Sequence, residues 1–317
     1  MQTLALASLN TYYLKDAALF RVSLNNLFRL QIVSGKYAEA DSGIRSLRDL
    51  RTAHNSAGAA ARLAPFEIYA RAKERQGFAG LPFEEAFRQS FRDFYGQLDD
   101  KSADQLFPWF SADLNSLQND LRKSLDGQKG KDEITLSDAL DLIKKYQVLQ
   151  VFRDILPLME PLIAEDDARR YIIDDNILVK TPDGASIATV VVRPRSATAR
   201  LPALLGFSIY ANNWVAARTT AAHGYVGVMA YTRGKGRSPD VPVPYEHDGS
   251  DACAVIDWIK SGSSVMFIFS PAKPTSAKDV GFVLFIFPLR SLFRLLCLDP
   301  GPSCSLCRCD LPPSRSR

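Results

Sequence analysis

The sequence is poor in the residues that most often mark a chemical centre. It contains only three histidines and five cysteines in 317 residues. One cysteine, Cys253, stands alone, and the others crowd the end of the chain: Cys297, Cys304, Cys307 and Cys309. This distribution excludes a disulfide framework for the main body. Four thiols match the ligand count of structural zinc, but their spacing is irregular. We therefore predict no metal site and no cofactor.

A strong charge of one sign and a long apolar run are also lacking. The formal net charge is +4, and Lys and Arg are mixed with Asp and Glu along most of the chain. Without a basic stripe, we predict no nucleic-acid partner. The longest apolar stretch, residues 280–298, is broken by Pro288, Arg290 and Arg294, so we predict no membrane span. The apolar start, residues 1–9, has neither a basic segment before it nor a cleavage-like site. The sequence therefore does not indicate a compartment.

Residues 9–165 have a helical pattern throughout. Apolar residues recur every three or four positions, as in Phe83, Phe87, Phe91 and Phe94, which is typical of amphipathic helices. Breaks are expected at Gly35, at 77–82 and at 127–130. We assign residues 1–168 to an all-α N-terminal domain.

One hairpin within this domain is more specific. In residues 24–53, Gly35 is followed by Tyr37 and by the small residue Ala40. This spacing resembles the turn between the two helices of a tetratricopeptide repeat, where Gly ends the first helix and a small residue allows close packing. No second copy is found at a period of about 34 residues. An ordinary helical hairpin therefore remains the alternative.

From residue 169 to 260 the period changes to two, and β-branched residues dominate. Two strands, 171–180 and 186–194, flank the turn signal Thr181-Pro-Asp-Gly184. Short apolar runs at 201–207 and 225–230 are typical of strands buried on both faces of a mostly parallel sheet. Helices are expected at 214–223 and 248–259. This order predicts the first part of an open α/β domain.

Residues 261–317 differ from the rest of the chain. Acidic residues nearly vanish, whereas Phe, Pro, Ser, Cys and Arg accumulate without a consistent period. We expect an aberrant, unstructured tail of non-native sequence.

Four ordered segments of the α/β region, residues 180–194, 201–210, 224–238 and 245–259, together resemble the beginning of the X-Pro dipeptidyl-peptidase and cocaine-esterase family of serine hydrolases. The resemblance covers about ninety residues. The first segment has Asp-Gly in the turn and Arg-Pro at the strand end, the third contains Arg-Gly-x-Gly-x-Ser, and the fourth ends in Asp-Trp-Ile. It implies an α/β-hydrolase fold.

The resemblance also implies roles for individual residues. Tyr210 matches a tyrosine that helps to form the oxyanion hole, where a preplaced donor stabilises the developing negative charge. Arg233, Gly234 and Gly236 match structural positions near the site: the glycines form a tight turn, and the arginine makes an ion pair beneath the site. The family usually has Asp two positions before this arginine. Here Tyr231 takes its place, so the usual charge partner is missing.

The catalytic triad is not found. An α/β-hydrolase carries its nucleophile in a G-x-S-x-G turn, followed by the acid and then the histidine, and this sequence has no such motif after Trp258. Ser208 follows a strand, but the resemblance places it in the oxyanion loop. His54, His223 and His247 all precede the expected nucleophile. We therefore expect a fragment, truncated before the nucleophile and inactive as given.

Two functions remain open from the sequence. The resemblance implies that the intact form hydrolyses a small acyl ester or an Xaa-Pro peptide. The alternative is a helical protein-interaction module with a non-catalytic α/β appendage, in which the helical domain binds a protein partner.

Overall fold

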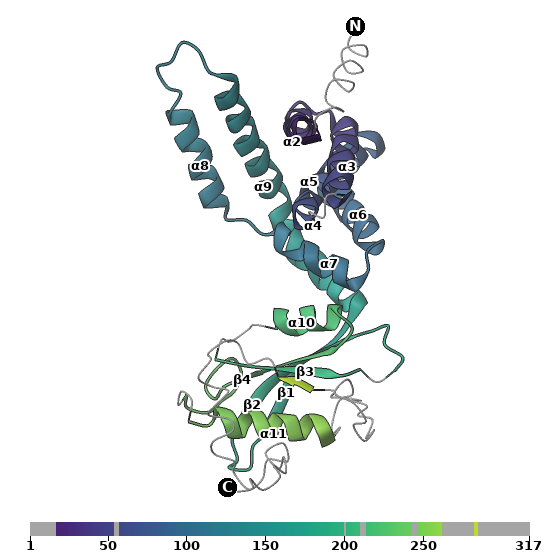
Figure 1. The fold of residues 1–317 in the computed structure, drawn as a ribbon, viewed down its shortest axis with the longest axis vertical. Coiled ribbons are helices and arrows are strands. Elements are labelled where there is room, and N and C mark those ends of the chain that lie inside the picture. Colours follow the sequence, from purple (N-terminus) through teal and green to yellow (C-terminus); the bar gives the residue numbers. More distant parts are fainter. Residues whose placement is uncertain are drawn as a thin grey trace, which may run out of the picture. The chain divides into compact units, whose positions relative to one another are not determined.

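The computed structural model of the protein describes residues 17–53, 57–199, 201–209, 214–242, 246–261 and 282–284. The chain divides into two compact units, Met1–Asp166 and Asp167–Arg317. The first unit is helical, and the second contains a sheet with helices (Figure 1). The predicted fold class, a helical N-terminal part followed by a partial α/β part, is confirmed.

The helical unit contains α2 (Ala17–Val33), α3 (Tyr37–Ala53), α4 (Ala57–Ala61), α5 (Ala64–Ala79), α6 (Phe83–Gly96), α7 (Asp100–Leu106), the 3-10 helix η1 (Phe107–Phe110), α8 (Leu114–Asp126) and most of α9 (Leu136–Arg170). Its core is formed by apolar residues at helical spacing, such as Phe28 and Ile32 of α2, and Phe87 and Phe91 of α6. The expected breaks near residues 35, 80 and 127 are present.

The first two described helices form a hairpin. Gly35 adopts a φ of +75°, a conformation that glycine tolerates without steric cost. The Lys36 N–H donates to the carbonyl of Gln31 at 2.8 Å, and Ala40 is fully buried. Small Ala40 thus lies in the packed core of the unit. A helical hairpin is present, and its likeness to a tetratricopeptide repeat stays a prediction.

The α/β unit is built on a mixed sheet. Its strands are β1 (Tyr171–Lys180), β2 (Ser186–Pro194), β3 (Ala203–Ser208), β4 (Val226–Tyr231) and β5 (Phe282–Leu284). Their order is β1-β2-β4-β3-β5. The pairs β1–β2 and β2–β4 are antiparallel, whereas β3 pairs in parallel with both β4 and β5. The expectation of a mostly parallel sheet is therefore corrected to a mixed one.

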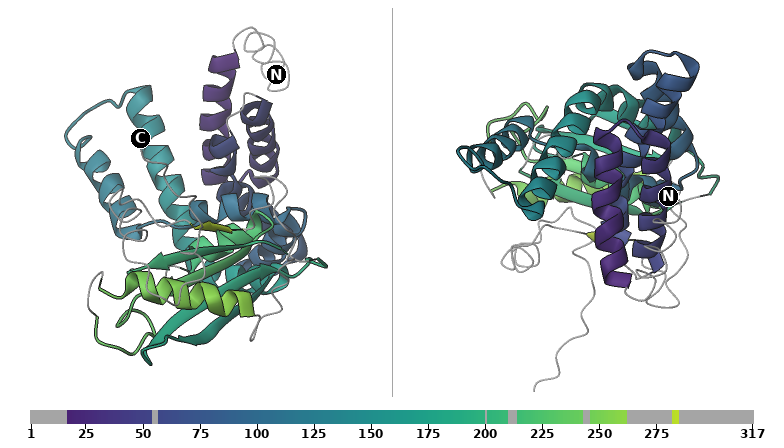
Figure 2. Two further views of the ribbon diagram at one scale, coloured as in Figure 1. Left: turned by 60° about the horizontal axis from the view of Figure 1, so that its bottom comes forward. Right: turned by 90° about the horizontal axis from the view of Figure 1, so that it is seen from above.

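Two helices cover opposite faces of this sheet. Helix α10 (Val215–Ala222) lies on one face and α11 (Asp248–Ser261) on the other (Figures 1 and 2). Strand side chains alternate between the faces: Val228 packs in the cluster with α11, and its neighbour Met229 packs with α10. This alternation follows from the two-residue period of a strand. The sheet is therefore buried on both sides.

The expectation for residues 261–317 is wrong for Phe282–Leu284. These residues form β5, with Phe282 opposite Ala203 and Leu284 opposite Leu205. Three apolar residues in a row can pair with the open edge of β3 without showing a period of their own. The rest of this segment, including Cys297, Cys304, Cys307 and Cys309, lies outside the described residues.

Candidate functional site

The candidate site lies where β3 and β4 end. These two strands are parallel, with Ser208 opposite Tyr231 at their carboxyl ends. The Thr232 N–H donates to the carbonyl of Ser208 at 3.1 Å, so the pairing continues one residue beyond β4. The carboxyl ends of parallel strands are where open α/β sheets place their ligand sites. The segments that follow both strands thus begin at one edge of the sheet.

The segment after β4 makes a tight turn that requires glycine. Gly234 and Gly236 have φ values of +71° and +58°. A Cβ on Gly234 would lie 2.5 Å from Cδ of Pro242 and 2.7 Å from the carbonyl oxygen of Asp240. Both the dihedral angle and the space therefore favour glycine at position 234.

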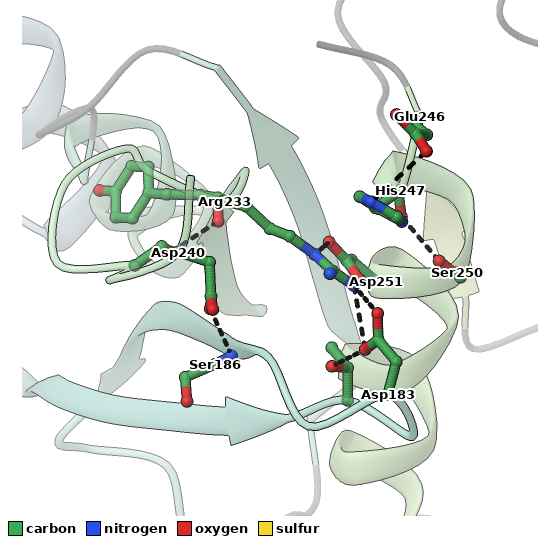
Figure 3. A network of polar contacts seen from close by, with 11 residues as sticks. Asp183, Ser186, Arg233, Asp240, Glu246, His247, Ser250 and Asp251 are labelled. Atoms are coloured by element: carbon green, nitrogen blue, oxygen red, sulfur yellow. Dashed lines mark hydrogen bonds and ion pairs between the residues drawn. The ribbon is translucent and has the colours of Figure 1, made fainter. Parts of the chain in front are cut away.

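Two side chains of this segment hold it against β2. The buried Ser238 hydroxyl donates to the carbonyl of Tyr231 and accepts from the Ala188 N–H, each at 2.9 Å. The Asp240 carboxylate accepts from the Ser186 N–H at 3.0 Å (Figure 3). Backbone groups at the start of β2 thereby gain partners that the sheet does not supply. The turn is fixed by side-chain hydrogen bonds as well as by its glycines.

Arg233 joins this turn to two other parts of the unit. Its Nε and Nη2 atoms donate to the two carboxylate oxygens of Asp251, on α11, at 2.8 and 2.6 Å. Nη2 also lies 2.8 Å from Oδ2 of Asp183, in the turn between β1 and β2 (Figure 3). The Asp251 side chain is fully buried, and that of Arg233 is 12% exposed. A bidentate pair of this kind combines charge with a fixed geometry.

Burial and charged neighbours at this site shift the pKa values of Asp183, Arg233 and Asp248. The hydrogen bond from the Thr181 hydroxyl, together with the Arg233 guanidinium, lowers the pKa of Asp183 to about 2. Hydrogen bonding to Asp251 raises the pKa of Arg233. Burial, reinforced by the charge of Asp251, raises the pKa of Asp248 at the start of α11. Arg233 is thus held as a cation between two carboxylates.

The sequence predicted an ion pair for Arg233 but not its partners. Tyr231, which stands where the family has Asp, is buried in β4 and packs in the core with α10. Asp251 and Asp183 supply the negative charge instead. Both lie within segments that carried the resemblance, but neither is at a fixed spacing from Arg233, so no sequence pattern predicts the pairing. Because both carboxylates engage its guanidinium, Arg233 is suited to hold the turn rather than to bind substrate.

The other predicted site residues are less completely described. Tyr210 and His54 lie outside the described residues. Ser208, two positions before Tyr210, ends β3. His223 caps the end of α10, where its Nδ1 lies 2.8 Å from the carbonyl of Thr219. His247 precedes α11, and its carbonyl accepts from the Asp251 N–H.

Within the part of the chain that the structure describes, no group of three or more metal-binding side chains occurs. None of the helices described has the length and apolar character needed to cross a membrane. The described site is therefore a structural clamp beside a loop.

Comparison with known proteins gives a family match for part of the α/β unit. Residues 183–283 match the sequence model of the X-Pro dipeptidyl-peptidase (S15) family. The predicted resemblance is thereby confirmed for this segment, which is about a third of the 317-residue chain. The match begins at Asp183, includes the Arg233 turn and α11, and ends within β5. No curated protein matches the chain in sequence.

Solved structures give weaker likenesses. A CocE/NonD family hydrolase from Staphylococcus aureus is 18% identical, with a TM-score of 0.25, over 28% of this chain and 20% of that one. A hypothetical protein from Pseudomonas aeruginosa is 18% identical, with a TM-score of 0.26, over 31% of this chain and 32% of that one. A brefeldin A esterase, a bacterial homologue of human hormone-sensitive lipase, is 20% identical, with a TM-score of 0.26, over 49% and 38%. The chain thus spans well under half of each protein, and TM-scores of this size do not establish a shared activity.

Proposed function

We propose that the α/β unit is the first part of the catalytic domain of a serine hydrolase, which in its intact form cleaves a small acyl ester or an Xaa-Pro peptide. The family match over residues 183–283 is the observation that carries this proposal. The sheet order supports it, because β3, β4 and β5 are parallel neighbours whose carboxyl ends share one edge. Such an edge is where this fold places its nucleophile and its oxyanion hole.

Tyr210 is proposed to serve the oxyanion hole. It lies two residues beyond Ser208, the last residue of β3, so its loop starts at the same edge as the Arg233 turn. Attack on a carbonyl group places negative charge on the oxygen, and a phenolic hydroxyl placed in advance can donate to it. Arg233, Gly234 and Gly236 are proposed to fix the neighbouring turn and not to take part in the reaction.

The 317-residue chain is proposed to be catalytically inactive. The nucleophile is expected directly after the strand that follows α11, and β5 occupies this position beside β3. The residues that follow β5 in the sequence, 285–289, are Phe-Ile-Phe-Pro-Leu and contain no serine, threonine or cysteine. No G-x-S-x-G occurs anywhere in the chain. Loss of the nucleophile alone costs about 10⁶ in turnover.

Reading the encoding DNA beyond codon 260 in all three frames tests the hydrolase proposal. We expect one frame to continue from α11 into an apolar strand followed by G-x-S-x-G. A downstream sequence in which no frame encodes that motif contradicts the proposal.

A second candidate function is protein binding by the helical unit. Helix α8 favours it, because none of its residues is buried and Leu125 is 50% exposed, although Leu114 and Leu117 pack against the core of the unit. Polar contacts join this helix to α9: Ser124 donates to Asp141 at 3.3 Å, and Lys145 pairs with Asp141 at 2.6 Å. The candidate predicts that residues 1–166 capture a partner in stoichiometric amount and that Leu121→Asp with Leu125→Asp abolishes capture. Recovery of no such partner favours a helical unit that serves only the hydrolase.

A further inference from the structure

Helix α2 presents arginines but no acidic residue. Its sequence, AALFRVSLNNLFRLQIV, contains Arg21 and Arg29. These residues and Asn25 are spaced four apart, so they share one face of the helix. Arg29 is buried, with 8% of its surface exposed. Its Nη1 donates to Oε1 of Gln147 on α9.

Two further arginines lie at the same face. Arg51, near the end of α3, donates to Oδ1 of Asn25 at 3.4 Å and to the carbonyl of Ala59 at 2.7 Å. Arg62, in the turn before α5, has its guanidinium 4.5 Å above the ring of Trp109. We call Arg21, Arg29, Arg51 and Arg62 the arginine cluster. It gathers residues from α2, from α3 and from the turn between α4 and α5.

The cluster differs from most other arginines of this unit. Most of these have carboxylate partners, as in Arg48 with Glu67 at 2.6 Å, Arg71 with Asp41 at 2.9 Å and Arg92 with Glu165 at 2.7 Å. Among the residues that the structure describes, no carboxylate pairs with any member of the arginine cluster. The acids nearest in sequence are already engaged: Asp41 with Arg45 and Arg71, and Asp49 with Arg48. The cluster therefore concentrates positive charge without a counter-charge among the described residues.

Burying positively charged side chains next to one another costs free energy unless an anion or hydrogen bonds compensate. Burial, with the charge of Arg51, lowers the pKa of Arg29 to about 10. Burial also lowers the pKa of Arg51, with Arg62 and Arg21 adding to the effect. A buried cation is normally stabilised by an anion or by a full set of hydrogen bonds. Arg29 has instead the faces of Phe28 and Phe66, at 4.8 and 5.1 Å, and one side-chain carbonyl.

Two buried donors at the inner end of the cluster have no acceptor. Nε of Arg29 and Nε2 of Gln147 make no hydrogen bond within the described part of the chain. Gln147 is fully buried, and its other atom, Oε1, already holds Arg29. The inner end thus offers N–H donors beside a charge, the combination that recognises a carboxylate or a phosphate.

We propose that the arginine cluster is a binding site for an oxyanion, either a carboxylate or a phosphate group of a small ligand. Arg29 and Gln147 donate from the inner end, Arg51 lies beside them, and Arg62 and Arg21 attract the anion from the rim. This site belongs to the helical unit and does not depend on the hydrolase proposal.

Equilibrium dialysis of the full chain against radiolabelled inorganic phosphate tests this site, with citrate as the carboxylate competitor. We expect saturable binding that citrate displaces. Arg51→Gln should weaken the affinity about tenfold or more, because it removes one charge-assisted contact. Arg51→Lys, which keeps the charge, should weaken it less. Arg88→Gln is the matched control, since Arg88 lies on α6 and only approaches Glu84 at 4.0 Å; its affinity should not change.

Arg62→Gln is the second variant, in case Arg51→Gln loosens the helices. Arg62 is exposed and its described contact is with Trp109, so the variant should keep the helical circular dichroism and still bind phosphate several-fold more weakly. Saturable binding of citrate without phosphate identifies a carboxylate ligand and also supports the site. Absence of saturable binding to either anion by folded protein overturns the proposal. Equal binding by wild type, Arg51→Gln and Arg62→Gln overturns it as well.

Discussion

Arg233 connects three segments that are far apart in the sequence: the turn after β4, the β1–β2 turn and α11. Its fork geometry is needed because it meets both oxygens of Asp251 and also reaches Asp183. Lysine carries the same charge but cannot make these contacts together. Asp251 is fully buried, so its charge depends on this partner.

Replacing Arg233 should therefore destabilise the α/β unit. Arg233→Ala leaves the Asp251 carboxylate buried and unpaired, which costs about 3 kcal/mol or more. Arg233→Lys should cost less, about 1 to 2 kcal/mol. Hydrogen exchange measured on peptides from β2 and α11 reports this loss directly. Arg237→Ala is the control, since Arg237 is exposed and donates a hydrogen bond to Asn176. A loss as large as that of Arg233→Ala would show that the effect is not specific to the Arg233 clamp.

The pKa of Asp183 gives a second test at the residue scale. Its folded value of about 2 lies below the ordinary 3.8, so its contribution to stability is present above about pH 4 and is lost as the pH falls through about 2. Thr181→Val removes the hydroxyl hydrogen bond that contributes most to the lowered pKa of Asp183. The titration midpoint of Asp183 should therefore move up toward 3.8. Titration of the carboxyl carbon by NMR measures it. An unchanged midpoint in Thr181→Val would assign the shift to Arg233 alone.

At the scale of elements, local patterns predicted most of the α/β unit. The strands Tyr171–Lys180 and Ser186–Pro194 begin and end at the predicted residues, because a Pro-Asp-Gly turn fixes their register. The strand Phe282–Leu284 was missed, since three residues in an irregular apolar stretch have no period. The strand pairs there because β3 offers an open edge, which is a property of the sheet and not of the segment.

Helix α9 shows the same limit of local reasoning. It runs from Leu136 to Arg170 with Pro157 and Pro161 inside it, and β1 begins at the next residue. Proline removes a helical hydrogen bond and favours an earlier end of the helix. The helix nevertheless continues through both prolines, and Ile155, Leu158 and Leu162 on either side of them pack into the core. Core packing on both sides of the prolines is consistent with a helix that continues through them.

Gly227 makes possible the close approach of α10 to β4. A Cβ there would lie 2.0 Å from the carbonyl oxygen of Ala217, so Gly227→Ala must displace α10. We expect a loss of about 3 kcal/mol or more, measured by hydrogen exchange in α10. Gly206→Ala on β3 is the matched control, because its Cβ meets only the flexible end of Met229, at 2.8 Å, and should cost less than about 1.5 kcal/mol. Equal effects of the two variants would contradict this account of the packing.

At the scale of the whole molecule, the sequence predicted the order of the two parts and the family resemblance of the second. It placed Arg233, Gly234 and Gly236 in one turn through their motif, but Asp251 comes to Arg233 only through the packing of α11 on the sheet. The arginine cluster had no motif at all, because its members come from separate helices that each have an ordinary composition. Local patterns thus predict elements and family, whereas charge partners depend on tertiary structure.

We propose that this chain carries part of the scaffold of a serine hydrolase without its nucleophile. Labelling of the full chain with a fluorophosphonate serine probe tests it most directly, with an active serine esterase as the positive control. We predict that the esterase is labelled and that the folded chain is not labelled above the heat-denatured background. Labelling of the folded chain that a single change such as Ser208→Ala abolishes would contradict the claim.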